Sequence, residues 1–569
     1  MPCLGSARFV LDFPGVSVRL SLRRPRSSSR SFRISYSSSI ATSTRWPPRR
    51  EFSIMAAHLR SDFFEYTSGR WIFNDDLRHA ERRRVFKIDE LSRLAAEAVN
   101  RSPDDIVRLE KLAEGGFNRT FLITMRCGFG MVARIPYPAT IPKYFAIASE
   151  VATMALLRSF GLPIPEVYRY SPMPNNAAGT EYIFMEFVQG TSLSDIWFDP
   201  GEREIISISR QLAELESKMM SIAFPAGGSL YYIEDLENAA ESASWPTRPG
   251  ITLDDKRFCV GPDTSLRLWY GRRSQLDLDR GPLPKQPPRG AEKELAYLRQ
   301  FGRTAVAVPA RKEGSLQVPG AAAVRSHRDL DRYLLLASSL SPGTQHSVIS
   351  TSAIPTTTMS WFAIYDAAFA TEKLDDMDET QQSGEMELYR RRLVHYHYVK
   401  NTEEYNELHY AALTDPMGVL RRRLFCHASD PWEGETLALK VALIQATKNW
   451  KKLTGGGPPC PVVFDPDDVR ETMKLDAEQK EADECLEACR DVIGFGQEGW
   501  VPVEHYEEAM ALSKKLKEDG LAAAESEEER AQIAAHWPFD DMDEEEYDCL
   551  AIHVIEPVYQ LRNQNIEVY

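Results

Sequence analysis

The chain has 569 residues, of which 43% are hydrophobic and 27% charged, and its formal net charge is −15. These values are typical of a soluble globular protein that is long enough for two or more domains. No apolar run reaches the roughly 18 residues that a membrane-spanning helix needs. The eight cysteines lack paired C-x-x-C spacing, which argues against a structural zinc site and against a disulfide framework.

Residues 1–60 carry a charge opposite to that of the rest of the chain. They contain 11 Arg and no Lys against two acidic residues, a balance of +9, so the remaining residues carry −24. A body that acidic binds nucleic acids and anionic membranes poorly, so we expect no nucleic-acid partner. A phosphate-bearing ligand would need local cations or a metal ion.

Residues 1–60 also have the composition of an organellar presequence, with 13 Ser and few acids. Within them, 16–22 can form one or two amphipathic helical turns, and 49–53 resembles a mitochondrial processing site cleaved after Phe52. The alternatives are an ordinary disordered tail, or a protein whose translation starts at Met55. We predict a disordered presequence and a mitochondrial protein.

Residues 61–107 begin with an aromatic segment and continue into a helix predicted over 88–100. We expect the aromatic segment to pack against the small lobe that the following residues form. Its aromatic residues are Phe63, Phe64, Tyr66, Trp71 and Phe73.

The stretch from Arg108 to Gly190 alternates strands, tight turns and one helix, and in the hairpin at 127–130 glycines are expected to supply the positive φ that a tight turn needs. In chain order we predict a strand at 109–112, a turn at Glu114-Gly115-Gly116-Phe117-Asn118, a strand at 120–125, a turn at 127–130, a strand at 131–135, a helix at 145–160 and a strand at 182–188. The residues expected on the inward face of the helix are Ile147, Val151, Met154 and either Leu156 or Leu157.

This order of elements suits a nucleotide site. Backbone N–H groups of a glycine turn can bind phosphates. A cation on the next strand, Arg134, can clamp them, and a helix acid, Glu150, can hold that cation in place. The alternative is a β-hairpin with a buried helix and an incidental surface Arg. The predicted nucleotide contacts, which include backbone groups offered to a base at the end of the last strand, are Gly115, Gly116, Phe117, Asn118, Arg134, Glu150, Glu186, Phe187 and Val188.

Three segments carry a family resemblance: Glu-Gly-Gly-Phe-Asn-Arg-Thr-Phe from residue 114, Val-Ala-Arg-Ile-Pro from residue 132, and Phe-Met-Glu-Phe-Val-Gln-Gly from residue 184. They resemble the small lobe of the kinase-like phosphotransferases of the aminoglycoside and choline kinase type. More narrowly, the chain resembles the fungal mitochondrial branch named altered inheritance of mitochondria protein 9.

The resemblance implies an α+β, protein-kinase-like fold with a five-stranded small lobe and a mainly helical large lobe. It also implies ATP with Mg²⁺ between the lobes and an acceptor that bears a hydroxyl group. One position departs from the pattern, because the phosphate-binding cation of such kinases is usually Lys and here it is Arg134. Arg stays charged and can hold phosphate bidentately, but it need not position it in the same way.

After this lobe, Glu202–Met220 is predicted as a long amphipathic helix that begins the large lobe, and 227–232 as a hairpin strand. The apolar residues of the helix are Ile205, Ile208, Leu212 and Leu215.

A phosphotransferase of this type needs an Asp that orients the acceptor hydroxyl, an Asn about five residues later, and a second metal-binding Asp. His327-Arg328-Asp329-Leu330 matches only the beginning of that pattern, because Leu334 stands where the Asn is required. The apolar spacing that follows is helical. We therefore predict that Asp329 is an acid in the first turn of a helix and faces water.

Residues 341–371, where the resemblance places the catalytic loop, contain no His-x-Asp and no Asn, and Ile364-Tyr365-Asp366 only faintly echoes the metal-binding strand. The resemblance returns at Leu388. Either the protein is a non-catalytic relative, or the printed sequence departs here from the expressed one. Catalytic and metal-binding residues are therefore unassigned, and whether the chain is an enzyme stays open.

Three other features predict ordinary structure. His395 and His397 are expected on a helix, and no Cys or carboxylate stands at ligand spacing from them. Residues 455–459 are expected to form a loop and no phosphate cradle, because no Lys-Ser/Thr pair follows the glycines. Cys485 and Cys489 lie one helical turn apart, and two ordinary thiols are favoured over a redox pair.

Residues 466–548 are strongly acidic and helical, with helices predicted to begin at Asp467-Asp468, Val503-Glu504 and Ser526-Glu527. We expect a solvated helical extension that packs on the large lobe. A surface for basic partner proteins is the alternative.

The predicted organisation is a presequence at 1–60, a small nucleotide-binding lobe at 61–189, a large lobe at 190–384 with its catalytic segment disrupted, and a helical remainder with the acidic extension at 385–569. The predicted function is that of a mitochondrial, kinase-like phosphotransferase-family protein that binds an ATP-type nucleotide between its lobes. The alternatives are a non-catalytic binding or scaffold module, and an active small-molecule phosphotransferase whose catalytic exon is misassigned in the printed sequence.

Overall fold

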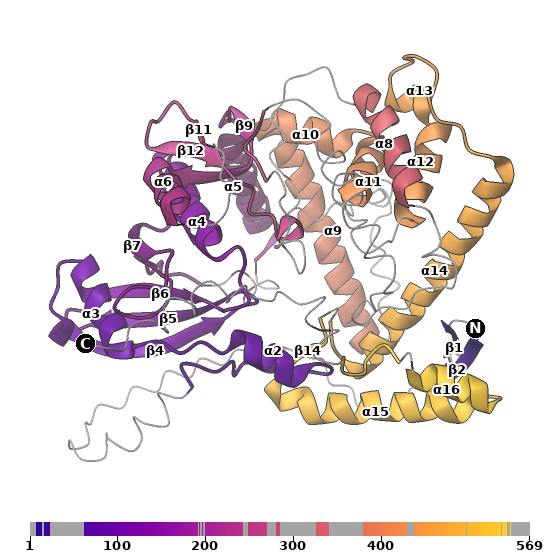
Figure 1. Cartoon of the computed structure of the whole chain (residues 1–569), viewed down its shortest axis with the longest axis horizontal. Coiled ribbons are helices and arrows are strands. Elements are labelled where there is room, and N and C mark those ends of the chain that lie inside the picture. Colours follow the sequence, from indigo (N-terminus) through magenta and orange to yellow (C-terminus); the bar gives the residue numbers. More distant parts are fainter. Residues whose placement is uncertain are drawn as a thin grey trace, which may run out of the picture.

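The structure is a computed structural model, and it is described here for residues 7–13, 16–22, 62–191, 193, 196, 200–242, 249–269, 280–284, 326–340, 379–429, 437–496, 498–535, 537–542 and 547. It is a mixed α/β protein with a β-sheet region toward the N-terminus and a helical region toward the C-terminus, side by side in Figure 1.

The main sheet has five antiparallel strands in the order β4-β5-β6-β8-β7. The predicted number of strands is present, but the edge strand β7 was not located from the sequence. The strand bounds are β4 Ile106–Glu114, β5 Asn118–Met125, β6 Gly130–Pro136, β7 Val167–Ser171 and β8 Tyr182–Glu186.

Helices cover both faces of this sheet because its central strands are apolar on both sides. On one face, Phe121 and Ile123 of β5 pack against α3 (Ile88–Ala98) and against Phe63 and Phe64. On the other face, Val132 and Ile183 pack against α4 (Lys143–Ser159). We call this second side the α4 face. Of the two leucines left open for the inward side of α4, Leu156 is the buried one.

The glycines of the two predicted turns differ in conformation. Gly128 has φ of +85°, the left-handed conformation expected for the hairpin between β5 and β6. Gly130, the other glycine of that hairpin, does not have positive φ, and neither do Gly115 and Gly116 of the first turn. The turn between β4 and β5 is instead closed by a hydrogen bond from Gly115 N to Asn118 O at 2.9 Å.

A second, three-stranded sheet packs on the other side of α4, in the order β10-β12-β11. Phe145 and Ala148 of α4 meet Tyr231 and Cys259 of this sheet in one buried cluster. Helix α4 therefore lies between two sheets. The neighbouring elements are α6 Ile233–Ser242, β9 Ala226–Gly227, β10 Ser229–Tyr232, β11 Ile251–Thr252, β12 Phe258–Gly261, η2 Leu266–Leu268 and β13 Leu283–Pro284, and β9 pairs with β13.

The helical region begins with α5 (Glu202–Met220), as predicted, although the predicted apolar face is partly wrong. Ile205 is buried, but Leu212 is 45% exposed, and the helix packs through small residues such as Ser209 and Ala213. The further helices are α8 Ser326–Leu340, α9 Glu379–Tyr405, α10 Glu407–Thr414, α11 Gly418–Ser429, α12 Leu437–Lys448 and α13 Trp450–Leu453.

The C-terminal extension, residues 466–547, contains the three predicted helices. The first begins where the Asp465 carboxylate accepts hydrogen bonds from the backbone N–H groups of Asp467 and Asp468, and it ends at Gly494 with φ of +92°. The elements are α14 Pro466–Ile493, β14 Trp500–Pro502, η9 Val503–His505, α15 Tyr506–Ala523 and α16 Glu527–Ala535.

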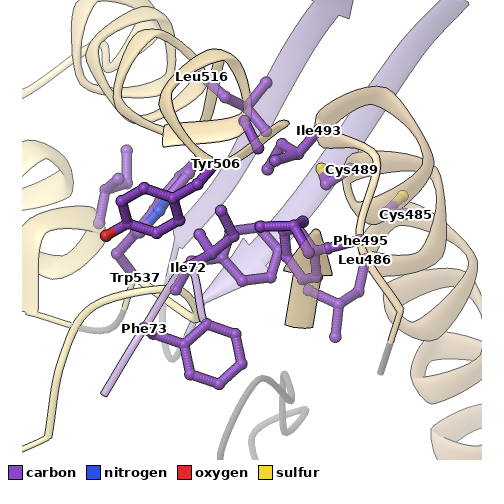
Figure 2. Packing of buried hydrophobic residues seen from close by; sticks show 14 of the residues in the cluster. Ile72, Phe73, Cys485, Leu486, Cys489, Ile493, Phe495, Tyr506, Leu516 and Trp537 are labelled. Atoms are coloured by element: carbon purple, nitrogen blue, oxygen red, sulfur yellow. The ribbon is translucent and has the colours of Figure 1, made fainter. Parts of the chain in front are cut away.

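The extension packs on more than the helical region. An ion pair between Lys440 and Asp468 does connect it to α12, at 2.6 Å. Its apolar core, however, includes Ile72 and Phe73 from the aromatic segment (Figure 2). The prediction that this segment packs on the small lobe is thus right for Phe63 and Phe64 and wrong for Phe73.

A two-stranded sheet completes this junction, because β3 (Gly69–Trp71) pairs antiparallel with β14. Helix α2 (Asp75–Arg82) follows β3 and lies beside β14 and α15 in Figure 1. Residues near the two ends of the described chain thus belong to one packed unit.

Two further elements belong to the N-terminal residues. Strands β1 (Ala7–Phe13) and β2 (Val16–Leu22) pair antiparallel, so the helical turns predicted over 16–22 are replaced by a strand. A presequence in 1–60 stays a prediction. Among the described helices, no long one has a stretch apolar enough to cross a membrane.

Candidate functional site

The candidate site is built around an ion pair between a strand and a helix. Arg134 lies in the middle of β6, in register with Ile183 of β8, which packs against α4. Directly opposed residues of paired strands point to the same face, so Arg134 points toward α4. There its guanidinium pairs with the carboxylate of Glu150. The predicted pairing is present, and a role toward phosphate stays a prediction.

The pair is accessible to a ligand. About one third of each side chain is exposed, 35% for Arg134 and 32% for Glu150. A guanidinium fixed by one carboxylate keeps further N–H donors for a second anion, because it carries five. The arrangement can therefore hold a phosphate oxygen without losing Glu150.

Partial burial raises the pKa of the Glu150 carboxyl, and the charge of Arg134 lowers it again by a smaller amount. An acid whose pKa is raised in the folded protein contributes stability below its ordinary pKa and loses that contribution as the pH rises through the raised value. We expect carboxyl-detected NMR to show Glu150 titrating above an ordinary Glu, and still higher in Arg134→Ala. In Glu150→Gln, this part of the pH dependence of unfolding should disappear. Titration of Glu150 at or below the ordinary value would contradict the description.

The glycine turn lies close to this pair. Thr120 is the residue of β5 in register with Arg134, and the turn ends at Asn118, two residues before it. Two residues along a strand span about 7 Å. The turn is also bound to the residue that follows β6, since the N–H of Tyr137 donates to the carbonyl of Phe117 at 2.9 Å.

The tip of the turn is open. A Cβ atom built at Gly116 would meet no atom of the described residues within 4 Å. Phe117 exposes its ring beside it. The turn can thus approach a ligand closely with its backbone, as the predicted phosphate contacts of Gly115, Gly116, Phe117 and Asn118 require.

Glu114 and Arg119, which flank the turn, form a buried pair that the sequence reasoning missed. The Nε of Arg119 donates to Glu114 Oε1 at 3.0 Å, and each side chain is only 1% exposed. The carboxylate also accepts hydrogen bonds from the aromatic segment, through Thr67 N and Ser68 Oγ at 2.8 and 2.7 Å. The alternation of β5 was the available signal, because Arg119 stands on the same side as the buried Phe121.

The predicted base-binding edge lies at the end of β8. The N–H of Glu186 donates to Glu166 O at 2.8 Å, and its carboxylate accepts from Glu166 N at 3.1 Å. Phe187 packs partly into the cluster under α4, whereas Val188 is exposed. The N–H of Glu186 is therefore already bound and is not available to a base.

The segment expected to hold the catalytic loop, 341–371, lies outside the described residues, so its assignment rests on the sequence. The His327-Arg328-Asp329 match does lie in a helix, α8, as predicted. The prediction that Asp329 faces water is wrong, because it is 1% exposed and pairs with Arg332 at 2.8 Å. Burial raises the pKa of Asp329, and the hydrogen bond and charge of Arg332 lower it by a smaller amount. It is a structural acid between α8 and its neighbours.

The remaining predicted features are structural. His395 and His397 lie on α9, and His397 Nε2 is 3.2 Å from Glu202 Oε1 of α5. Across the described ranges, no group of three or more His, Cys, Asp or Glu side chains is placed to hold a metal ion. Cys485 and Cys489 form no disulfide and are buried in the core of the extension (Figure 2), and burial raises the pKa of Cys489 to about 12.

Comparisons with known proteins give similarity over most of the chain but no family assignment. No family model matches the sequence. A subtelomeric hrmA-associated cluster protein of Aspergillus fumigatus is 27% identical over 514 aligned residues, which cover 77% of this chain and 97% of that protein.

A second group of relatives is named for mitochondria. Altered inheritance of mitochondria protein 9 of Clavispora lusitaniae is 28% identical over 244 residues, 36% of this chain and 40% of that protein. The chain is similar to these proteins in part of its length. The namesake of Saccharomyces cerevisiae is 24% identical over 299 residues, 42% of this chain and 47% of that protein, and both are described as mitochondrial.

Among solved structures, a chain described as a fructosamine-3-kinase from Thermobifida fusca is 12% identical and covers 63% of this chain and 100% of its own, with a TM-score of 0.27. We draw nothing from a likeness at that level.

Proposed function

We propose that the chain is a kinase-like, two-lobe protein of mitochondria whose small lobe binds an ATP-type nucleotide with Mg²⁺. The phosphates would lie between the glycine turn and the Arg134 guanidinium, and the base at the end of β8. The partners would be the nucleotide and, for a transfer reaction, an acceptor that bears a hydroxyl group.

The observation that carries this proposal is the ion pair of Arg134 and Glu150. It joins the middle of the sheet to the helix beside it, leaves the guanidinium one third exposed, and lies two residues along the sheet from the glycine turn. A fixed cation next to a glycine turn between antiparallel strands is the arrangement by which kinase-like proteins hold phosphates. Mitochondrial location is supported by the names of the partial relatives and by the composition of residues 1–60.

A second candidate is a binding module that holds nucleotide without transferring phosphate. It is favoured by the sequence of 341–371, which has neither His-x-Asp nor Asn. Without an Asp to orient the acceptor and groups to hold the metal, a bound nucleotide has no reaction centre. Sequencing the transcript across codons 335–390 decides whether this segment is expressed as printed.

The binding proposal is tested by thermal unfolding with and without Mg·ATP. Ligand at about 100 times its Kd stabilises the native state by about 2.7 kcal/mol, so the melting temperature should rise by several degrees. We expect Arg134→Ala to abolish the rise. Arg169→Ala is the matched control, because Arg169 pairs with Glu97 on the surface at 3.4 Å, away from the turn, and it should keep the rise.

The two candidates separate in a transfer assay with labelled γ-phosphate. Nucleotide binding with phosphoryl transfer to a hydroxyl compound supports the phosphotransferase. Binding without hydrolysis or transfer supports the binding module. A wild-type protein whose melting temperature does not respond to Mg·ATP contradicts both.

A further inference from the structure

The glycine turn is anchored at its beginning by the aromatic segment. Glu114, the last residue of β4, accepts hydrogen bonds from Thr67 N at 2.8 Å, Thr67 Oγ1 at 3.2 Å and Ser68 Oγ at 2.7 Å. Lys111 closes the same cluster, since its Nζ donates to Glu114 Oε1 and to Thr67 Oγ1, both at 2.9 Å. Moving residues 67–68 would therefore move the start of the turn.

The end of the turn is anchored through the loop after β6. The carbonyl of Phe117 accepts from Tyr137 N at 2.9 Å and from Thr140 Oγ1 at 2.5 Å. Between these two residues, Ala139 N donates to the carbonyl of Glu81 in α2 at 3.3 Å. Both ends of the turn thus lead back to residues 67–81, which we call the bridging segment.

The bridging segment is bound in turn by the C-terminal extension. Its strand β3 pairs with β14, and the N–H of Ile72 donates to Gly499 O at 2.9 Å. The N–H of Asn74 donates to the Asp541 carboxylate at 2.5 Å, and Asn74 Oδ1 accepts from Met542 N at 2.7 Å.

The far end of the segment is held as well. The hydroxyl of Tyr547 donates to the carboxylate of Glu81 at 3.0 Å. Within the extension, Lys517 of α15 forms an ion pair with Asp540 at 2.6 Å. The extension therefore holds the segment along its whole length.

We propose that the C-terminal extension is a positioning element for the glycine turn, acting through the bridging segment. Each step of the connection is a hydrogen bond or a strand pairing, so release of the extension should loosen the turn. The significance of the turn for a nucleotide rests on the proposed function. The coupling between the extension and the turn does not depend on that function.

Hydrogen exchange on the full-length protein tests the coupling. Asp541, on the surface of the extension, accepts the hydrogen bond from the N–H of Asn74, and Asp541→Ala removes this acceptor. Hydrogen bonds to charged groups are among the stronger ones, so we expect the two hydrogen-bonded amides at the ends of the turn, those of Gly115 and Tyr137, to exchange about tenfold faster. Asp541→Asn keeps an acceptor and should restore slow exchange.

The matched control is Asp476→Ala, which removes an acid of the same extension that pairs only one helical turn away, with Lys480 at 2.6 Å. It should leave the turn unchanged. The proposal is overturned if Asp541→Ala speeds exchange at β3 and β14 while the amides of Gly115 and Tyr137 keep the wild-type rate.

A variant at the other end of the connection gives a second test. Ser68→Asp places a carboxylate beside that of Glu114, and like charges repel. We expect faster exchange in the turn while α14 to α16 stay protected, and unchanged exchange in the turn would contradict the proposal.

Titration of the same proteins with Mg·ATP is an independent test. The Kd for the nucleotide should rise in the variants whose turn amides exchange faster. A wild type that binds no nucleotide would remove the proposed function and leave the exchange result to decide the coupling.

Discussion

Replacing Phe73 by Ala should destabilise the junction of the bridging segment and the extension by about 3–5 kcal/mol, the usual cost of removing a buried Phe ring. Phe73 is 1% exposed and lies between Phe495 and Phe539, with ring centroids at 6.2 and 6.3 Å. Its ring also occupies the space beside Gly499, where a Cβ atom would come within 2.7 Å of it.

The change is measured by urea denaturation, followed by tryptophan fluorescence, since Trp537 lies in the same core. Phe160→Ala is the control, because Phe160 is exposed at the end of α4 and its loss should change the free energy of unfolding by less than about 0.5 kcal/mol. A loss below about 1 kcal/mol for Phe73→Ala would show that the extension is not held by this core.

Arg119→Met should destabilise the protein by about 1.5–3 kcal/mol, because it removes one of the two cations that pair with the buried carboxylate of Glu114 and leaves Lys111, at 2.9 Å, as the other. The methionine fills most of the volume, so the loss reports on charge more than on packing. The control Arg108→Met breaks an exposed pair with Glu110 on the same strand and should cost less than about 1 kcal/mol.

The double variant Glu114→Leu with Arg119→Met separates charge from packing. Replacing both members of a buried pair by apolar residues is often close to neutral, so the double variant should be more stable than Arg119→Met alone. If it is less stable, the hydrogen bonds of Glu114 to residues 67 and 68 outweigh the charge.

The pH dependence gives the same pair a second signature. Burial acts to raise the pKa of Glu114, but hydrogen bonds from Lys111, Thr67 and Ser68 outweigh it and hold the pKa below the ordinary value. A lowered pKa stabilises the folded protein above the ordinary value, and that stability is lost as the pH falls through the lowered one. The loss on acidification should therefore be smaller in Glu114→Gln than in the wild type.

Short sequence patterns correctly predicted the helices whose formation depends on residues near one another in the chain. The period of apolar residues located α3, α4 and α5 within a few residues, and the acids that begin α14 and α16 stand where the helices start. The pairing of Arg134 with Glu150 was also accessible, because the strand, the helix and their order limit which charges can meet.

Contacts between distant residues were not predictable in the same way. Nothing in Gly69-Arg70-Trp71 indicates a strand whose partner lies more than 400 residues later, at Trp500–Pro502. The burial of Asp329 is similar, because a first-turn acid commonly faces water and only the packing of α8 against its neighbours places it inside. The φ of Gly115 and Gly116 depends on the bonds around the turn, which the sequence does not display.

The pairing of β3 with β14 also sets an order of events during synthesis. A ribosome that adds about 5–20 residues per second needs roughly 20–90 s to proceed from Trp71 to Trp500. During that interval Ile72 and Phe73 have emerged while the core that buries them does not yet exist. The nascent chain therefore presents Ile72 and Phe73 to chaperones until its last fifth is made, and a product that stops before residue 500 keeps these two side chains exposed.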